Sequence, residues 1–262
     1  MQKRLCVIGL NTEVFQEIRK NYFGPVIFHE TIPKYLVSKG KLYIERSNGV
    51  GMLEVDKVVF HGIFENDFDL ITALTIWGGN CYPNALGMMN CRLKLPCLAR
   101  ALKISNFNSE RGMISKNTEI NVTEETVAKW GNWHCGENKA KFNKNWISQE
   151  PSVIEPFFKG NSVRIVQIGE KNLQIRLEGK NWLKSIHDEN ADFMEIDQEL
   201  LEDTIKIKKE LNLDMIANDY ISSPNGEKHL LEVNHIPNVT RFEVLKNIYL
   251  SEVIKWINKE SK

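Results

Sequence analysis

Two lysines ten residues apart carry the clearest chemical signal in the chain. Lys129 follows a β-branched, strand-like run, Lys139 opens the next run, and the loop between them contains Gly131 and Gly136. Two ammonium groups flanking such a hairpin can face one polyanion, and glycines let backbone N–H groups approach phosphate oxygens closely. The spacing differs from that of a Walker A motif. The segment therefore indicates a phosphate site, with a solvated hairpin of a lysine-rich chain as the alternative.

Three oxygen-bearing side chains, Asp219, Glu232 and Asn234, predict a metal site. They lie on two strand-like runs joined by Pro-Asn-Gly, a strong signal for a hairpin turn. Glu232 and Asn234 have the same parity and point to one face, and the short turn brings Asp219 across from them. Two carboxylates and an amide oxygen suit Mg²⁺, which shares its shell with water and phosphate oxygens. A solvated sheet face is the alternative, although the residues flanking Glu232 are apolar.

A short hydrophobic run contains a single carboxylate. Glu155 is followed by Pro156, Phe157 and Phe158. Such a strand could hold an adenine ring, with backbone groups reading the edge of the base. Taken alone, the run fits a core strand with one exposed Glu better.

Two arginines and a lysine complete the set of candidate residues. Arg164 and Arg176 lie in runs that read as adjacent strands, and Lys184 lies beyond them. An arginine directed into a phosphate site can hold a transferring phosphoryl group or a developing oxyanion. Isolated arginines are more often partners in surface ion pairs, so their sequence positions leave both interpretations open.

The elements that must position these residues change character along the chain. Residues 1–92 read as a small α/β unit that begins with a buried strand. The helical pattern over 85–102 contains Pro96 as the expected start of its second half. From about residue 110, short β-rich runs alternate with glycine turns, and an amphipathic helix over 197–213 precedes the metal hairpin and a closing helix. This order predicts an α+β fold rather than regular βαβ units.

Bulk composition limits the classes of function. Lys plus Arg and Asp plus Glu both number 34 in 262 residues, so the formal net charge is zero and neither a nucleic acid nor a membrane surface is indicated as a partner. Five cysteines without a CxxC pair favour reduced thiols over a zinc ribbon or a disulfide framework. The N-terminal apolar run is too short for a signal peptide, and no segment approaches a transmembrane length. We therefore expect a cytoplasmic protein.

Taken in order, these segments resemble the ATP-grasp superfamily, and within it synapsins and ligases of the glutathione-synthetase and ribosomal-protein-S6-modifying type. VAKWGNWHCGENK resembles the synapsin segment between two nucleotide lysines, and EPFFKGNSVRIVQIG resembles the hinge strand and its successor. QIRLEGKNW resembles the arginine strand that runs into a G-x-W-K/R turn. HLLEVNH resembles the metal strand, where ligases usually read E-V-N. The resemblance covers about residues 90–250 and extends more loosely to the N-terminal unit.

The resemblance implies an ATP-grasp fold with two subdomains that clamp the nucleotide. A pre-ATP-grasp domain would span 1–92 and the ATP-grasp domain 93–262, with a mobile small subdomain at about 115–156. The implied ligands are ATP and Mg²⁺, with Mn²⁺ as a substitute, together with a small carboxylate and an amine or other nucleophile. Because ATP-grasp proteins are often dimers, a homodimer is also among the expectations.

The resemblance also implies individual roles. Asp219, Glu232 and Asn234 would hold the metal ions, Arg176 would sit at the γ-phosphate and the acyl-phosphate, and Lys184 would hold substrate or phosphate. Arg164 is the third catalytic candidate. The implied nucleotide-binding set is Lys94, Lys129, Gly131, His134, Gly136, Lys139, Glu155, Pro156, Phe157 and Phe158.

Two of these assignments rest on details of the match. Lys94 lies one residue before the position of the family's lysine ahead of the small subdomain. His134 matches a histidine of the synapsin loop, where contact with the ligand or ordering of the loop is a sufficient role. A nucleophilic role for the adjacent Cys135 would require a neighbouring base and a depressed pKa.

The resemblance leaves two functions open. An ATP-dependent ligase would let a carboxylate attack the γ-phosphate of ATP, and an amine would then open the acyl-phosphate. A non-catalytic, synapsin-like nucleotide-binding protein is the alternative. It is favoured by the segment WLKSIHDEN, in which neither the asparagine that usually follows the turn in the ligases nor a Gly-Gly loop is clear. An α+β domain without a nucleotide site would require all the ordered motifs to be coincidences.

Overall fold

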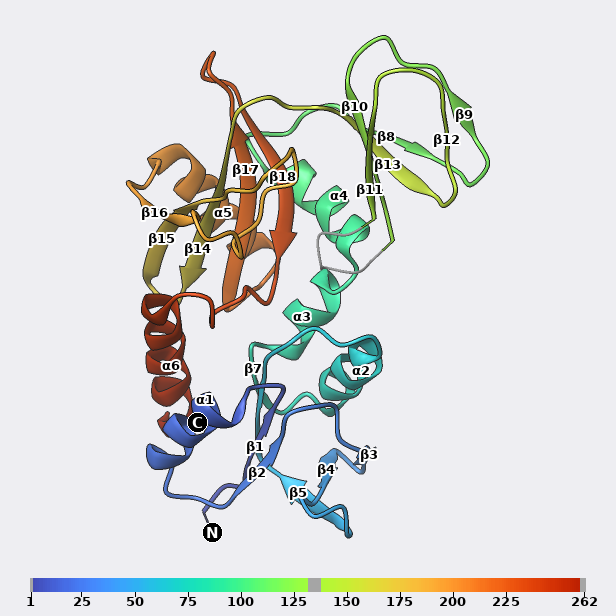
Figure 1. The fold of residues 1–262 in the computed structure, drawn as a ribbon. Helices are drawn as coiled ribbons and strands as arrows, with labels where there is room; N and C mark the ends of the chain where they lie inside the picture. The colour runs from blue at the N-terminus through green and yellow to red at the C-terminus, as the bar shows by residue number, and fades with distance from the viewer. Residues whose placement is uncertain (1, 132–137, 260–262) are drawn as a thin grey trace.

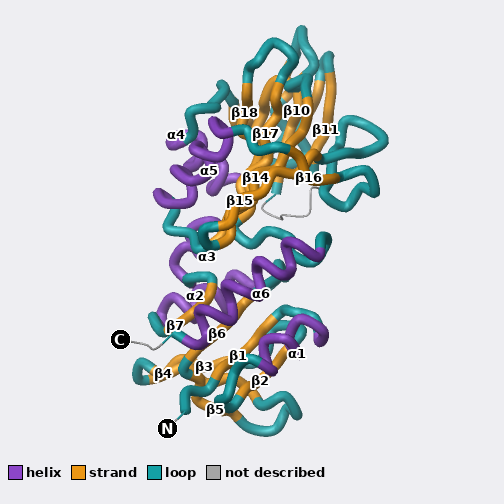
Figure 2. Tube along the Cα trace, turned by 90° about the vertical axis from the view of Figure 1, so that its left-hand side faces the viewer, coloured by secondary structure: helices purple, strands orange, loops and turns teal. Residues whose placement is uncertain are grey.

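The computed structural model describes residues 2–131 and 138–259 and has an α+β architecture (Figure 1). An N-terminal unit lies at one end of the molecule, a five-stranded antiparallel sheet lies above it, and a smaller antiparallel sheet stands beside the larger one. Helix α6 (Glu243–Asn258) lies between the large sheet and the N-terminal unit (Figures 1 and 2).

The N-terminal unit is built on a parallel sheet of order β2-β1-β6-β7. Its strands are β1 (Leu5–Ile8), β2 (Val26–His29), β6 (Lys57–Phe60) and β7 (Asn80–Tyr82). The helices are α1 (Thr12–Lys20), which the Asn11 side chain caps, and α2 (Asp67–Trp77), which ends at Gly78 in the left-handed conformation. Every residue of β1 and β6 is buried, as the continuous apolar run at the N-terminus predicts.

A second, antiparallel sheet is inserted between β2 and β6. It comprises β3 (Tyr35–Ser38), β4 (Lys41–Glu45) and β5 (Met52–Val55), with β4 in the centre. Leu42 and Ile44 alternate with more exposed residues along β4 and are completely buried, because one face of this sheet packs against α2.

Two helices lead from the N-terminal unit to the rest of the chain. The pattern over 85–102 forms α3 (Ala85–Cys91) and α4 (Lys94–Ile104). Pro96 is the third residue of α4 rather than its first. An N–H at this position has no intrahelical partner, so the ring is accommodated without the loss of a hydrogen bond.

The small antiparallel sheet has the order β11-β10-β13-β8. Its strands are β8 (Gly112–Ile114), β10 (Thr126–Trp130), β11 (Lys139–Phe142) and β13 (Ser152–Pro156). The short strands β9 (Glu119–Ile120) and β12 (Trp146–Ile147) form a separate ladder. Lys129 pairs directly with Lys139 in the β10–β11 register, so the hairpin predicted from the sequence is confirmed.

The large sheet has the order β16-β15-β14-β17-β18. Its strands are β14 (Asn161–Ile168), β15 (Lys171–Arg176), β16 (Asp192–Met194), β17 (Met215–Ser222) and β18 (Lys228–Asn234). Residues of the sheet contribute to two hydrophobic clusters. One includes Val166, Ile175 and side chains of α6 and the N-terminal unit, and the other includes Val163, Tyr220 and side chains of α4 and α5 (Gln198–Glu210).

Within the described ranges, no helix combines the length and the apolar character that crossing a membrane requires.

Candidate functional site

A cavity of about 520 Å³ lies between the small and the large sheet. Strands β10, β11 and β13 supply one side, and β14, β17 and β18 supply the other. The loop after β15 covers part of it with Trp182 and Lys184. The residues of the predicted adenine hinge, Glu155, Pro156, Phe157 and Phe158, all line this cavity.

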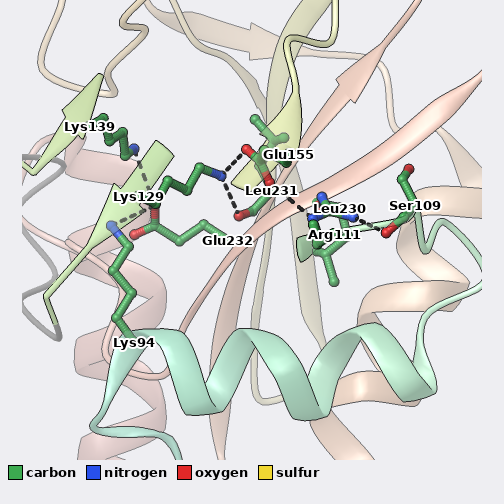
Figure 3. A network of polar contacts seen from close by, with 9 residues as sticks. All are labelled: Lys94, Ser109, Arg111, Lys129, Lys139, Glu155, Leu230, Leu231 and Glu232. Atoms are coloured by element: carbon green, nitrogen blue, oxygen red, sulfur yellow. Dashed lines mark hydrogen bonds and ion pairs between the residues drawn. The ribbon is translucent and has the colours of Figure 1, made fainter. Parts of the chain in front are cut away.

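Glu155 is the centre of a buried ion network rather than the exposed residue of a core strand. Its side chain is only 3% exposed and forms an ion pair with Lys129 and a second one with Arg111, whose Nε lies 3.0 Å from the carboxylate (Figure 3). Arg111 also donates to the backbone carbonyls of Ser109 and Leu230, so it ties the hinge to β18. Burial lowers the pKa of the Lys129 ammonium, and the charge of Glu155 opposes this shift.

Glu232 gathers two further lysines at the same cavity. Its carboxylate lies 3.1 Å from the Nζ of Lys94 and 3.6 Å from the Nζ of Lys139 (Figure 3). Lys94 projects from the first turn of α4, and its side chain is 5% exposed. The structure therefore brings all three candidate lysines to one place, with Lys129 donating to the backbone oxygen of Leu231 beside Glu232.

Asp219 lies directly across the strand pair from Glu232 and is held by Arg164. The β17–β18 register pairs Asp219 with Glu232, and a bulge follows immediately after Asp219. Arg164 is opposite Asp219 on β14 and donates two hydrogen bonds to its carboxylate, from Nε at 2.6 Å and from a terminal nitrogen at 2.8 Å. This bidentate pair fixes the orientation of both side chains.

Asn234 lies on the same face of the sheet as Glu232 and Asp219. It is two residues from Glu232 on β18, and its Nδ2 atom is buried without a hydrogen-bond partner among the described residues. In the described part of the chain, no group of three or more His, Cys, Asp or Glu side chains is suited to hold a metal ion. Two carboxylates with an adjacent amide fit Mg²⁺ that completes its shell with water and phosphate oxygens, and they do not form a closed protein cage.

A second cavity, of about 530 Å³, lies between the large sheet and the N-terminal unit. Its floor is formed by the residues that follow the carboxyl ends of β1 and β6, including Gly9, Asn11 and His61. The chain leaves β1 for β2 on one side, whereas β6 pairs on the other. This reversal of strand order is the position at which open α/β sheets bind ligands.

The backbone of this floor is closely packed. Gly9 has φ +85°, and a Cβ atom built on it would lie 1.9 Å from the backbone oxygen of His61. The ring of His61 is in turn 3.2 Å from the backbone oxygen of Pro237 in the loop after β18. Burial lowers the pKa of His61 to about 4, so this imidazole is neutral at physiological pH.

The two cavities adjoin and share residues. Lys184, Ser185 and Glu232 line both of them. Lys184 and Ser185 belong to the loop after β15, whose Trp182 ring packs edge-on against Phe157 at 6.2 Å between ring centroids. A ligand in the first cavity and a ligand in the second would therefore meet beside Glu232.

The structure does not bring Arg176 to either cavity. Arg176 pairs with Val163 across β14–β15, so it lies on the sheet face of Val163, opposite to that of Arg164 and Asp219. There it forms an ion pair with Glu178 at 3.1 Å, and about half of its side chain is exposed. The sequence placed both arginines on adjacent strands without fixing the face of each, and direct pairing with Val163 rather than Arg164 puts Arg176 on the opposite face from Arg164.

Of the three loop residues in the implied nucleotide set, only Gly131 is described. It has φ +72°, in the left-handed region that glycine adopts readily. His134 and Gly136 lie outside the described residues, as does Cys135.

Some residues of the site could not be found from sequence motifs. Arg111 carries no signal, because its partners Glu155 and Leu230 are distant in the chain. His61 had a weak one, since it directly follows a buried strand and precedes Gly62.

The fold has close counterparts among solved structures, although no protein-family model and no curated protein sequence matches the chain. D-alanyl-alanine synthetase A from Vibrio cholerae matches with a TM-score of 0.68 and 12% identity over 98% of this chain and 99% of that one. A RiPP-associated ATP-grasp ligase from Chryseobacterium gregarium, in complex with ADP and a leader and core peptide, matches with a TM-score of 0.59 and 14% identity over 97% of both chains. The macrocyclase MdnC from Microcystis aeruginosa, bound with precursor peptide MdnA, matches with a TM-score of 0.60 and 14% identity over 95% of this chain and 99% of that one. The chain therefore has the fold of ATP-grasp ligases along nearly its whole length.

Proposed function

We propose that this protein is an ATP-dependent ligase that joins a carboxylate to an amine through an acyl-phosphate intermediate. The observation that carries the proposal is the pair of adjoining cavities that share Lys184, Ser185 and Glu232. A protein that only bound a nucleotide would need the first cavity alone. A second cavity of similar size, which opens onto the same carboxylate side chain, would give a carboxylate substrate access to the terminal phosphate of a bound nucleotide and the amine access to the acyl-phosphate formed there.

The first cavity is assigned to ATP. Phe157, Phe158 and the backbone of the hinge would hold the adenine ring, while Lys94, Lys129 and Lys139 would move from carboxylate partners to the phosphates. Each ammonium group would exchange a carboxylate partner for a phosphate oxygen, so it would keep an anionic partner throughout. Asp219, Glu232 and Asn234 would then hold Mg²⁺, which neutralises phosphate charge when it is bound; Mn²⁺ prefers similar oxygen ligands.

The second cavity is assigned to the carboxylate and the amine. Arg164 and Lys184 both line it and are the cations placed to stabilise charge that develops on the transferred phosphoryl group and on the acyl-phosphate. Arg164 replaces Arg176 in this role. The small subdomain, at about 115–156, would close over the nucleotide, and Trp182 would help to exclude water. In this assignment residues 1–92 supply one wall of the substrate cavity and residues 93–262 supply the nucleotide site.

Two kinds of similarity support the assignment. The fold is shared with a D-alanyl-alanine synthetase, and with an ATP-grasp ligase and a macrocyclase whose structures contain bound peptides, so amino acids and peptides are the first carboxylates and amines to test. The sequence motifs also fall around one cleft in the order that the resemblance implies, apart from Arg176 and the undescribed loop residues.

The experiment is an ADP-release assay with Mg·ATP and pools of amino acids and short peptides, with hydroxylamine added to trap any acyl-phosphate as a hydroxamate. We expect pool-dependent ADP release that falls at least ~100-fold in Glu232→Gln, because the ligand shared by both cavities is lost. Glu227→Gln, an exposed change on the same hairpin, is the control. ADP release at the same rate with and without the pools, or ADP release that persists in Glu232→Gln, would contradict the proposal.

A nucleotide-binding protein without turnover is the second candidate. It is favoured by the position of Arg176, which pairs with Glu178 on the opposite face of the sheet instead of reaching the phosphates. This candidate predicts tight binding of Mg·ATP together with no ADP release from any pool. The same assay, combined with a binding measurement, therefore separates the two.

A further inference from the structure

A third cavity, of about 310 Å³, lies at the junction between the N-terminal unit and the large sheet. Strand β7 contributes Tyr82, and the β14–β15 turn contributes Gly169. The end of α5 contributes Lys208, and α6 contributes Glu252 and Trp256. Among the described residues, none lines both this cavity and one of the first two. A ligand bound here would therefore be separate from the nucleotide and from the substrates of the ligase.

Lys208 is a partly buried cation of this cavity that has no close anion. Its Nζ donates one long hydrogen bond, of 3.4 Å, to the backbone oxygen of Gly169, and it takes part in no ion pair within the described part of the chain. Burial lowers the pKa of this ammonium group, and the charges of Asp214 and Glu252 oppose the shift. Lys255 and Lys259 add two exposed ammonium groups to the lining. The cavity therefore offers several donors to an anionic group.

Two carboxylates line the same cavity. Asp214 accepts a hydrogen bond of 2.6 Å from the backbone N–H of Asn84, but it forms no ion pair with another described residue. Glu252 lies closely against Gly169, where an added Cβ atom would be 2.4 Å from the carboxyl carbon. The ion pair of Glu252 with Lys255 is long, at 3.9 Å. Acceptors for a cationic group are thus present beside the lysines.

The rest of the lining is aromatic and apolar. The rings of Tyr82 and Trp256 pack at 5.8 Å between centroids, and Leu213 also lines the cavity. The hydroxyl of Tyr82 is buried without a hydrogen-bond partner among the described residues, although buried hydroxyl groups are normally paired. This wall therefore combines apolar surface with a polar group that lacks a partner.

We propose that the third cavity binds a free α-amino acid with an apolar side chain. The carboxylate would lie among Lys208 and the two exposed lysines, and the ammonium group would lie against Glu252 and Asp214. The side chain would cover the ring of Trp256. Two carboxylates in the lining disfavour a polyanion such as phosphate, and three lysines disfavour a simple cation, whereas a zwitterion matches both signs of charge. The inference does not depend on the proposed ligase function.

The first test is a calorimetric titration of the full chain, without nucleotide, with L-leucine and with L-phenylalanine. Two derivatives of leucine are the controls, because N-acetyl-L-leucine lacks the ammonium group and L-leucinamide lacks the carboxylate. We expect leucine to bind at least ~10-fold more tightly than either derivative, since each derivative loses one charge-assisted contact. Equal affinity for leucine and a derivative, or no binding of either amino acid, would overturn the inference.

Variants then locate the site. Lys208→Met should weaken the binding of leucine at least ~10-fold. Lys209→Met, an exposed change on the same helix, should leave it unchanged, and so should Lys184→Met, which alters the lining of the first two cavities. Binding that is lost in Lys184→Met but kept in Lys208→Met would place the amino acid in the substrate cavity. That result would overturn this inference and leave the ligase proposal intact.

A nearly isosteric change of charge provides a second variant. Glu252→Gln should weaken the binding of leucine ~10-fold without weakening that of N-acetyl-L-leucine, because only leucine carries an ammonium group. Glu243→Gln, at a position on the same helix whose side chain is 68% exposed, is the matched control and should change neither affinity. Equal losses for the two ligands in Glu252→Gln, or no loss for leucine, would overturn the assignment of the ammonium group and the inference with it.

Discussion

At the scale of single residues, the site consists of ion pairs in which each carboxylate holds one or two cations. Glu155 holds Arg111 and Lys129, Glu232 holds two lysines, and Asp219 holds Arg164. The residue types were visible in the sequence, and so was the face of the sheet that Asp219, Glu232 and Asn234 share. The burial of Glu155 was not, because it depends on Arg111, which reaches the hinge from a different segment.

Loss of Glu155 should therefore affect folding as well as nucleotide binding. Glu155→Ala leaves the buried ammonium of Lys129 and the guanidinium of Arg111 without their anion, and we expect a loss of about 3–5 kcal/mol in the free energy of unfolding. Glu150→Ala removes the exposed partner of Lys116 in the same sheet region and should change it by less than about 0.5 kcal/mol. Urea denaturation of both variants measures these changes in the free energy of unfolding. Equal changes in the two variants would show that the buried ion network does not stabilise the fold.

His61 should make stability depend on pH. Its pKa falls from the ordinary 6.5 to about 4 in the folded state, so the unfolded chain binds the proton first as the pH is lowered. The associated stability is intact above pH ~6.5 and is lost progressively towards pH ~4, a difference of about 2–3 kcal/mol. His61→Gln should remove this part of the slope in urea denaturation between pH 7 and pH 4.5. Parallel curves for wild type and variant would contradict the assignment.

At the scale of elements, periodicity and turn signals predicted the hairpins that carry the lysines and the metal ligands. They missed the short strands β3, β5, β7 and β8, each of which is four residues or fewer and is defined by its pairing partner rather than by its own pattern. They also could not fix the β14–β15 register. Since a shift of one residue exchanges the two faces of a strand, the sequence left open which face of the sheet Arg176 occupies.

The contact between the ends of β1 and β6 gives a prediction at this scale. Gly9→Ala would place a methyl group 1.9 Å from the backbone oxygen of His61 in a conformation that favours glycine. We expect it to cost more than about 2 kcal/mol and to weaken binding in the second cavity. Gly40→Ala is the matched control, because φ there is +72° but nothing lies within 4 Å of the added atom. Its cost should be about 1 kcal/mol, from backbone strain alone. Thermal unfolding of the pair tests this, and similar Tm values would show that the close approach is not rigid.

At the scale of the whole molecule, the sequence motifs indicated the ATP-grasp fold, and the structural likeness to ATP-grasp ligases confirms it. The second cavity was not predictable, because it arises where loops after β1, β6, β15 and β18 converge. One hydrophobic cluster joins the N-terminal unit, α6 and the large sheet, and loops of the N-terminal unit line the second cavity together with Glu232 and Asn234. The proposed function therefore depends on Glu232, the carboxylate that lines both cavities and forms ion pairs with Lys94 and Lys139.

Calorimetric binding of ATP, with and without Mg²⁺, to wild type and Glu232→Gln tests this claim most directly. We expect tight, magnesium-dependent binding to the wild type. In the variant, magnesium should no longer strengthen binding, and ATP alone should bind at least as well as before, because Lys94 and Lys139 have lost the side chain that holds them. The same magnesium dependence in both proteins would contradict the role of Glu232, and no binding of ATP to the wild type would overturn the nucleotide site itself.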